Sequence, residues 1–181
     1  MADITRTRMT LDEFRALPES LDHIELIDGE LIMSPAPKQP HQDATGDTYV
    51  VLKKLPKGKA VVSPMDVYLD DETVVQPDVF WVSGADSRCK LGADGYWHGA
   101  PDLLVEVLSP TTALRDHGVK FDLYERHGTR EYWLLDPDGE FVEVFRRQQE
   151  AFVRLGVFGR GDSFALGVLP DVTISVSDLF A

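Results

Sequence analysis

Residues 102–108, DLLVEVL, decide the fold, because they form an apolar run with one acidic residue, Glu106, inside it. Alternate residues of a strand face opposite sides, so apolar side chains would lie on both faces here. Such a pattern predicts a strand covered on both sides, as parallel strands in α/β proteins are. An uncompensated buried carboxylate costs several kcal/mol, so Glu106 needs a cation, hydrogen bonds or a proton. A structural salt bridge and a functional site would each meet that need.

A second acidic residue, Asp78, lies inside another apolar run, VVQPDVFWV at 74–82. Pro77 cannot donate a ladder hydrogen bond, which favours a sheet edge or a strand that begins near Asp78. If this strand lies beside residues 102–108, two carboxylates meet where water is scarce, and they repel unless a divalent cation neutralises both. Mg²⁺ suits such a site, since it takes oxygen ligands and often only one or two carboxylates. The pattern predicts a Mg²⁺ site, with Mn²⁺ as a substitute.

The flanking sequence alternates between helix and strand patterns. A capping box at 10–13, TLDE, predicts a helix to about Leu17, and Asp28-Gly29 between two apolar runs predicts an N-terminal hairpin. Further on we expect a helix at 41–54, strands at 60–69 and 74–82, a long polar loop at 83–101, a helix at 113–127, a β-meander across 131–158, and a short strand near 172–174 before a terminal helical turn. This order predicts an α/β fold in which helices flank a mixed central β-sheet, with an N-terminal hairpin and a C-terminal β-meander.

The length and composition set outer limits. A chain of 181 residues fits one domain, residues 1–181. No apolar stretch is long enough to cross a bilayer, and the first residues lack the apolar core of a signal peptide. We therefore expect no membrane partner and a cytoplasmic location. The lone cysteine, Cys89, agrees with a reducing compartment. Its basic neighbours could lower its pKa, although an incidental loop thiol is the simpler interpretation.

The net charge of −13 is unusual for a protein that binds nucleic acid, because phosphate neutralisation supplies most of such affinity. Binding would have to rely on the metal and on local basic clusters. Two such clusters are present, Lys53, Lys54, Lys57 and Lys59, then Arg126, Arg130, Arg146 and Arg147. Each is equally explained as a solvated surface.

Gln76-Pro77-Asp78 is followed, 28 residues on, by Glu106 in an apolar strand, and this pattern resembles the PD-(D/E)xK nuclease superfamily. Four sequence blocks are HIELIDGEL at 23–31, QPDV at 76–79, DLLVEVLSP at 102–110 and EYWLLDP at 131–137. Together these blocks resemble, more narrowly, a bacterial family of restriction endonucleases that was formerly a domain of unknown function. The resemblance implies a restriction-endonuclease-like fold and metal-dependent hydrolysis of phosphodiester bonds in nucleic acid, with DNA the expected substrate. It also implies that Asp78 and Glu106 are the catalytic, metal-binding acids.

The chain departs from the superfamily pattern at Leu108, where a lysine should follow the acid by two residues. That lysine would orient the attacking water and stabilise developing negative charge. Lys120, on the following helix, looks like the family's substitute and is the third expected catalytic residue. An exposed helix lysine is the alternative. The missing lysine and the acidic charge also motivate a second hypothesis, a catalytically silent nuclease fold that serves as a binding or dimerisation module.

Glu25 and His41 match further motif positions of the family. The resemblance implies a third metal carboxylate at Glu25, and at His41 an accessory group that binds phosphate or assists proton transfer. A hairpin surface charge and a helix-start residue, respectively, are the simpler interpretations.

The C-terminal meander is rich in aromatic residues, which could pack against a partner subunit or fill the core. With the resemblance, they lead us to expect a homodimer. The aromatic positions are Phe141, Phe145, Phe152 and Phe158. Other hydrolase classes have no support, because neither His-Glu-x-x-His nor Gly-x-Ser-x-Gly occurs in the chain.

Overall fold

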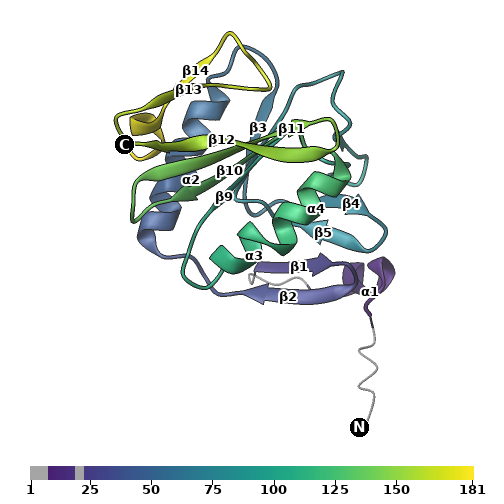
Figure 1. Ribbon diagram of the computed structural model, residues 1–181. Coiled ribbons are helices and arrows are strands. Elements are labelled where there is room, and N and C mark those ends of the chain that lie inside the picture. Colours follow the sequence, from purple (N-terminus) through teal and green to yellow (C-terminus); the bar gives the residue numbers. More distant parts are fainter. Residues whose placement is uncertain (1–7, 19–22) are drawn as a thin grey trace.

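The computed structural model describes residues 8–18 and 23–181 (Figure 1). Two large sheets and a small hairpin pack with a few helices in a mixed α/β arrangement. The helices are α1 Leu11–Arg15, α2 Gln39–Lys53, α3 Ala113–His117 and α4 Val119–His127, with a 3-10 turn η1 at Val176–Leu179. Within the described ranges, no helix is long and apolar enough to span a membrane.

The first six-stranded sheet contains β9, and its strand order is β12-β11-β10-β9-β6-β3. Only β9 and β10 run parallel among its neighbouring pairs, so the sheet is mixed, as expected. Its strands are β3 Lys59–Val62, β6 Val79–Val82, β9 Leu103–Val107, β10 Glu131–Asp136, β11 Phe141–Gln148 and β12 Ala151–Gly159. The last three strands form the predicted meander.

The second six-stranded sheet has the order β2-β1-β5-β4-β8-β7 and begins with the predicted N-terminal hairpin. Asp28 and Gly29 take φ values of 49° and 76°, as a type I′ turn requires. The strands are β1 His23–Ile27, β2 Glu30–Ser34, β4 Val67–Asp70, β5 Thr73–Val75, β7 Lys90–Leu91 and β8 Trp97–His98. A separate hairpin pairs β13 Ser163–Ala165 with β14 Thr173–Ser175.

Strand β9 is buried on both faces, as its sequence predicts. Leu103, Val105 and Val107 pack into the apolar cluster that contains Ala44 and Leu52 of α2. Leu104 and Leu108 pack on the opposite face with α4 and with residues of the second sheet. Figure 1 shows α2 and α4 on different sides of the sheet. Glu106 shares the periodicity of Leu104 and Leu108, which directs its side chain toward α4.

Three expected elements are interrupted in the structure. The single strands expected at 60–69 and 74–82 each divide between the two sheets, at Ser63-Pro64 and at Gln76-Pro77, so their bounds were wrong. The alternative of a strand that begins near Asp78 is confirmed, because β6 starts at Val79. A proline has no N–H to donate to a ladder, so neither run continues in one sheet. The helix expected at 113–127 breaks at Gly118 into α3 and α4. Helix α2 begins at Gln39, two residues before the expected start, with Pro40 in its first turn, and two short strands lie in the expected loop at 83–101.

Candidate active site

Asp78 and Glu106 lie on adjacent strands at the same end of the mixed sheet. Strands β6 and β9 pair antiparallel with Val79 opposite Val105, so Asp78 at the start of β6 lies beside the end of β9. The backbone N–H of Val107 donates to Asp78 Oδ2 at 2.8 Å, which ties the two strand ends together. The break at Pro77 therefore positions Asp78, because β6 starts only after it. The two carboxylates come from sequence positions 28 residues apart and share one strand end.

Lys120 is the cation that compensates Glu106. Its Nζ lies 2.9 Å from Glu106 Oε1, and the Tyr124 hydroxyl donates to the same oxygen at 2.6 Å. Glu106 is 3% exposed and Lys120 is 2% exposed. The alternative of an exposed helix lysine is therefore wrong, since α4 packs across the sheet and directs Lys120 inward.

Glu25 is fully buried, so its interpretation as a hairpin surface charge is wrong. Its Oε1 lies 3.0 Å from Lys120 Nζ and accepts a 2.9 Å hydrogen bond from the backbone N–H of Gln76. Its other oxygen, Oε2, is buried with no hydrogen-bond partner among the described residues. Strand β1 thus contributes an acid that shares one lysine with β9 and keeps one oxygen free.

His41 lies at the start of α2, as expected, and its ring faces the site. Its Nε2 is 3.3 Å from Asp78 Oδ2. Burial disfavours the imidazolium, but the nearby carboxylates, Asp78 first and then Asp116, outweigh burial and raise the pKa of His41. His41 can therefore hold a proton next to Asp78.

One lysine cannot neutralise two buried carboxylates equally. Burial alone would raise the pKa of Glu25, but Lys120 and the other partners of Glu25 bring it down to about 2. Burial raises the pKa of Glu106 to about 8, because Lys120 only partly offsets burial and the neighbouring anions Asp78 and Asp116 add to it. For Lys120, the surrounding carboxylates outweigh burial and raise its pKa, so the ammonium stays charged. Glu106 is the acid for which a further cation would matter most.

Tyr124 and Asp116 also belong to the site, and neither was among the site residues expected from the sequence. Asp116 is 2% exposed, and its burial raises its pKa despite the charge of Lys120. Tyr124 lies four positions after Lys120 within α4, a spacing that places both side chains on one helical face and could have indicated Tyr124. Asp116 lies in α3, before the break at Gly118, so helical spacing does not relate it to Lys120.

The comparisons with known proteins bear on this arrangement. A family model described as "Uma2: Putative restriction endonuclease" matches residues 11–177. The chain belongs to the Uma2 family. A solved structure, described as a putative nuclease belonging to DUF820 from Anabaena variabilis ATCC 29413, is 27% identical, with a TM-score of 0.77 over 95% of this chain and 97% of that one. No curated protein matches the chain. The expected restriction-endonuclease-like fold and family are therefore confirmed.

The donors in this Uma2 family member fit a Mg²⁺ ion held by few protein ligands. No group of three or more His, Cys, Asp and Glu side chains is arranged around one metal position in the described part of the chain. The hydrogen bonds and ion pairs of the two acids go to Glu106 Oε1 and Asp78 Oδ2, which leaves Oε2 and Oδ1 for another ligand. The free oxygen of Glu25 adds a buried donor that lacks a partner. Mg²⁺ needs one or two carboxylates and completes its shell with water and phosphate, so this donor set suffices.

The basic clusters of this Uma2 family member lie away from these acids. Lys59 pairs with Val82 at the far end of β6, and Arg130 forms a 3.5 Å ion pair with Asp102, just before β9. Arg126 pairs with Asp28 and Arg146 with Glu131, so most of the arginine cluster is already matched by acids. Cys89 is buried, and burial raises its pKa to about 12, which overrides the basic neighbours that suggested a lower value.

Proposed function

We propose that this Uma2 family member is a Mg²⁺-dependent endonuclease that hydrolyses phosphodiester bonds in DNA. The observation that supports it most is the meeting of Asp78 and Glu106 at one strand end, with the Lys120 ammonium held at 2.9 Å from Glu106. Family membership supports nuclease chemistry in general. We also propose that residues 1–181 act as one restriction-endonuclease-like domain.

In this proposal Asp78 and Glu106 hold Mg²⁺, or Mn²⁺ in its place, and Glu25 offers a further oxygen through Oε2. The bound ion supplies Lewis acidity at phosphorus and a more acidic water. Lys120 keeps Glu106 oriented through Oε1 and adds positive charge where negative charge develops. His41 holds Asp78 through Oδ2 and can pass on a proton, since its raised pKa favours the charged form. Catalysis is thus assigned to Asp78, Glu106 and Lys120, with His41 accessory.

The test compares DNA cleavage in Mg²⁺ and Mn²⁺ by the wild type, Asp78→Asn and Glu106→Gln. Asp171→Asn is the matched control, because it makes the same chemical change at an exposed residue. We expect cleavage to fall by about 100-fold or more in both site variants, as removal of one essential electrostatic group does elsewhere, and to stay unchanged in the control. Equal cleavage by the wild type and Asp78→Asn would show that these acids do not carry the activity.

The second hypothesis, a catalytically silent binding or dimerisation module, rests on Leu108 and on the ion pair that already occupies Glu106 Oε1. Mn²⁺ titration by calorimetry distinguishes the metal-dependent enzyme from the catalytically silent fold. Metal binding that is lost in Asp78→Asn supports the enzyme, whereas absence of binding in the wild type supports the silent fold. Cleavage assays with matched duplex DNA, single-stranded DNA and RNA then test the proposed preference for DNA.

We also propose that the chain forms a homodimer through the edge strand β12. The aromatic residues that suggested a dimer are largely internal, since Phe145 and Phe152 contact Phe121 in the core. The exposed apolar side chains of β12 are instead Val153, Leu155 and Val157, at 43%, 45% and 46% exposure. Among the described residues β12 pairs with β11 alone, which leaves its other edge open to a second strand.

A further inference from the structure

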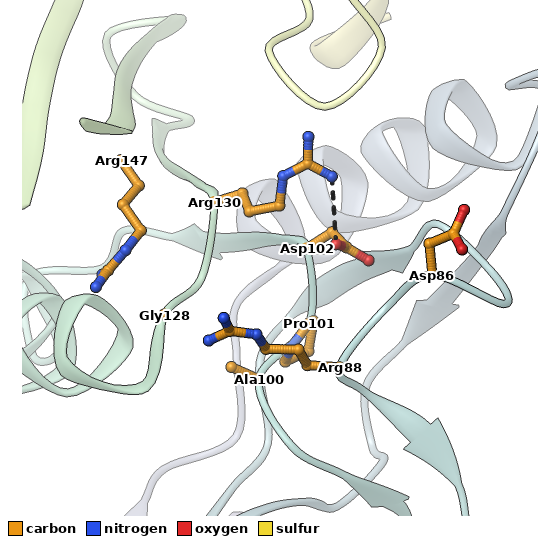
Figure 2. A pocket seen from close by; sticks show the side chains of 8 residues that line it. All are labelled: Asp86, Arg88, Ala100, Pro101, Asp102, Gly128, Arg130 and Arg147. Carbon is orange, nitrogen blue, oxygen red and sulfur yellow. Dashed lines mark ion pairs between the residues drawn. The ribbon is translucent and has the colours of Figure 1, made fainter. Parts of the chain in front are cut away.

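A polar cavity lies at the opposite end of β9 from the candidate active site (Figure 2). Its volume is about 210 Å³, and its charged lining consists of Asp86, Arg88, Asp102, Arg130 and Arg147. Asp102 precedes Glu106 by four residues, which corresponds to about 13 Å along a strand. Helix α4 spans the same interval, with Lys120 near its start and Gly128 just beyond its end. The cavity is thus separate from the carboxylate cluster.

Three arginines against two aspartates give this lining one net positive charge, in a chain whose net charge is −13. Of the two acidic groups in the lining, Asp102 is matched within the protein. Asp102 accepts a 2.8 Å hydrogen bond from the backbone N–H of Ser83 and pairs with Arg130 at 3.5 Å. In Figure 2 the carboxylate of Asp86 points away from the arginines.

The C-terminal end of α4 also meets the cavity, and the negative pole of a helix there disfavours an anion. Arg147 offsets part of this effect, because its guanidinium donates to the carbonyl oxygen of Glu125 in the last turn. Arg147 therefore neutralises the helix end, and Arg130 partly neutralises Asp102. The remaining arginine, Arg88, takes part in neither of these two interactions, so its positive charge is not offset by them.

Arg88 extends toward Gly128, as Figure 2 shows, and no described residue forms an ion pair or side-chain hydrogen bond with its guanidinium. A Cβ on Gly128 would lie 3.2 Å from Arg88 Nη1, so the absence of a side chain there gives the guanidinium its space. Arg130 is held only by a long ion pair at a half-exposed side chain, which is a weak interaction. Both guanidinium groups can therefore turn to a ligand, and their planar forks match the oxygens of phosphate.

We propose that this cavity binds a phosphate group through Arg88 and Arg130, with Arg147 adding positive charge beside them. The phosphate belongs either to a nucleic-acid strand or to a small phosphorylated molecule, since both present the same oxygens. Only the strand assignment rests on the proposed nuclease function, in which a strand cleaved at Glu106 is also held about 13 Å away along β9. Such a site gives an acidic protein a local means to bind phosphate without its catalytic metal.

The test measures ligand binding to the full chain in the absence of divalent metal. Its result is therefore independent of whether the protein proves to be a nuclease. The probes are a short fluorescent single-stranded oligodeoxynucleotide and inorganic phosphate, the latter both alone and as a competitor. The variants are Arg88→Gln, the charge-conserving Arg88→Lys, and Arg160→Gln as control, since Arg160 is an exposed arginine paired with Glu140 elsewhere. Thermal melting should be unchanged in Arg88→Gln, because no described partner loses a contact.

We expect Arg88→Gln to weaken binding about 10-fold, as loss of a charged hydrogen-bonding group does, and to reduce the log–log salt slope for the oligonucleotide by roughly 0.7. Arg88→Lys should keep the slope and lose affinity, because it keeps the charge without the fork. Oligonucleotide binding that phosphate competes away supports a strand site, and phosphate binding alone supports a small-molecule site. The proposal is overturned if neither probe binds, or if Arg88→Gln and Arg160→Gln behave alike.

Discussion

Lys120 connects three parts of the chain at the scale of a single side chain. Its ammonium lies 2.9 Å from Glu106 on β9 and 3.0 Å from Glu25 on β1, and all three groups are buried. Removal of one partner from a buried charge cluster is strongly destabilising, because the remaining charges are left uncompensated. The same residue that the resemblance assigns to catalysis therefore also joins the two sheets.

Lys120→Met is expected to lower the free energy of unfolding by about 3–5 kcal/mol, since the buried Glu25 carboxylate and the buried Glu106 side chain would lose their shared cation. Urea unfolding monitored by circular dichroism at neutral pH measures the change. Lys57→Met makes the same substitution at an exposed residue and should change stability by less than about 0.5 kcal/mol. A loss below 1 kcal/mol in Lys120→Met, about the size of a typical single substitution, would mean that the carboxylates find other compensation.

His117 makes the stability of the fold depend on pH, independently of the Glu25, Glu106 and Lys120 contacts. Burial disfavours its charged form, but the Glu143 carboxylate 3.0 Å away and the carbonyl of Ala113 outweigh burial and raise the pKa of His117 above 6.5. A raised folded-state pKa means that the stabilisation is complete below pH 6.5 and is lost as pH rises through the folded pKa. The pair is partly exposed, so its contribution is only about 0.5 kcal/mol.

His117→Gln should therefore remove a small decrease in unfolding free energy between about pH 6 and pH 8, where an imidazole titrates. Urea unfolding of both proteins at closely spaced pH values measures the difference. If the variant keeps the wild-type pH slope, the pair with Glu143 is not its source.

At the scale of the helix, we expect the same substitution to have opposite effects on stability at two glycines, one after α4 and one inside α2. Gly128 follows α4 at φ 88°, and a Cβ there would approach Arg88. Gly46 lies inside α2 with no atom within 4 Å of an added Cβ. Gly128→Ala should thus destabilise by about 1 kcal/mol through left-handed strain, whereas Gly46→Ala should stabilise by up to about 1 kcal/mol through helix propensity. Thermal melting of the pair measures both, and a shift of the same sign in both variants would contradict this account.

Local signals in the sequence predicted the elements well wherever one element stays in one sheet. The capping box at Thr10 and the turn at Asp28-Gly29 are both present, because each depends only on neighbouring residues. Each of the runs around Pro64 and Pro77 was assigned to one strand, because periodicity continues on both sides of the proline. Only at Pro77 did the sequence also favour a strand that begins near Asp78. A change of sheet leaves the alternation of apolar residues intact, so only the missing N–H indicated the break.

The sequence predicted individual residues of the candidate site, but it did not predict the contacts between them. Glu106 was identified because a carboxylate inside an apolar strand demands a partner. Its contact with Lys120 exists because α4 packs across β9, and the sequence does not indicate that packing. The burial of Glu25 depends on sheet pairing between β1 and β5, nearly 50 residues apart, which no local pattern encodes. Long-range contacts of this kind account for most of what the sequence left open.

At the scale of the whole molecule, the two ends of β9 carry different sets of charged residues. The acids Asp78 and Glu106 lie at one end, and Arg88, Arg130 and Lys59 lie at the other. An acidic protein would otherwise repel a polyanion from every side, and local basic patches lower that barrier. The proposed metal and the proposed phosphate cavity would each supply positive charge at one end of the same strand.

The open edge of β12 makes a last prediction, about assembly. An exposed strand with three outward apolar side chains invites pairing with another strand, and a second copy can pair antiparallel about a twofold axis. Light scattering should then give twice the 20.2 kDa mass of the chain. Leu155→Lys should give the monomer mass, because a lysine on an edge strand disfavours its pairing with another strand. Leu114→Lys is the control, since Leu114 is an exposed leucine at 93% on α3, away from β12, and it should remain dimeric. A wild-type mass of 20.2 kDa at high concentration would exclude the dimer, and loss of the dimer in both variants would place the interface elsewhere.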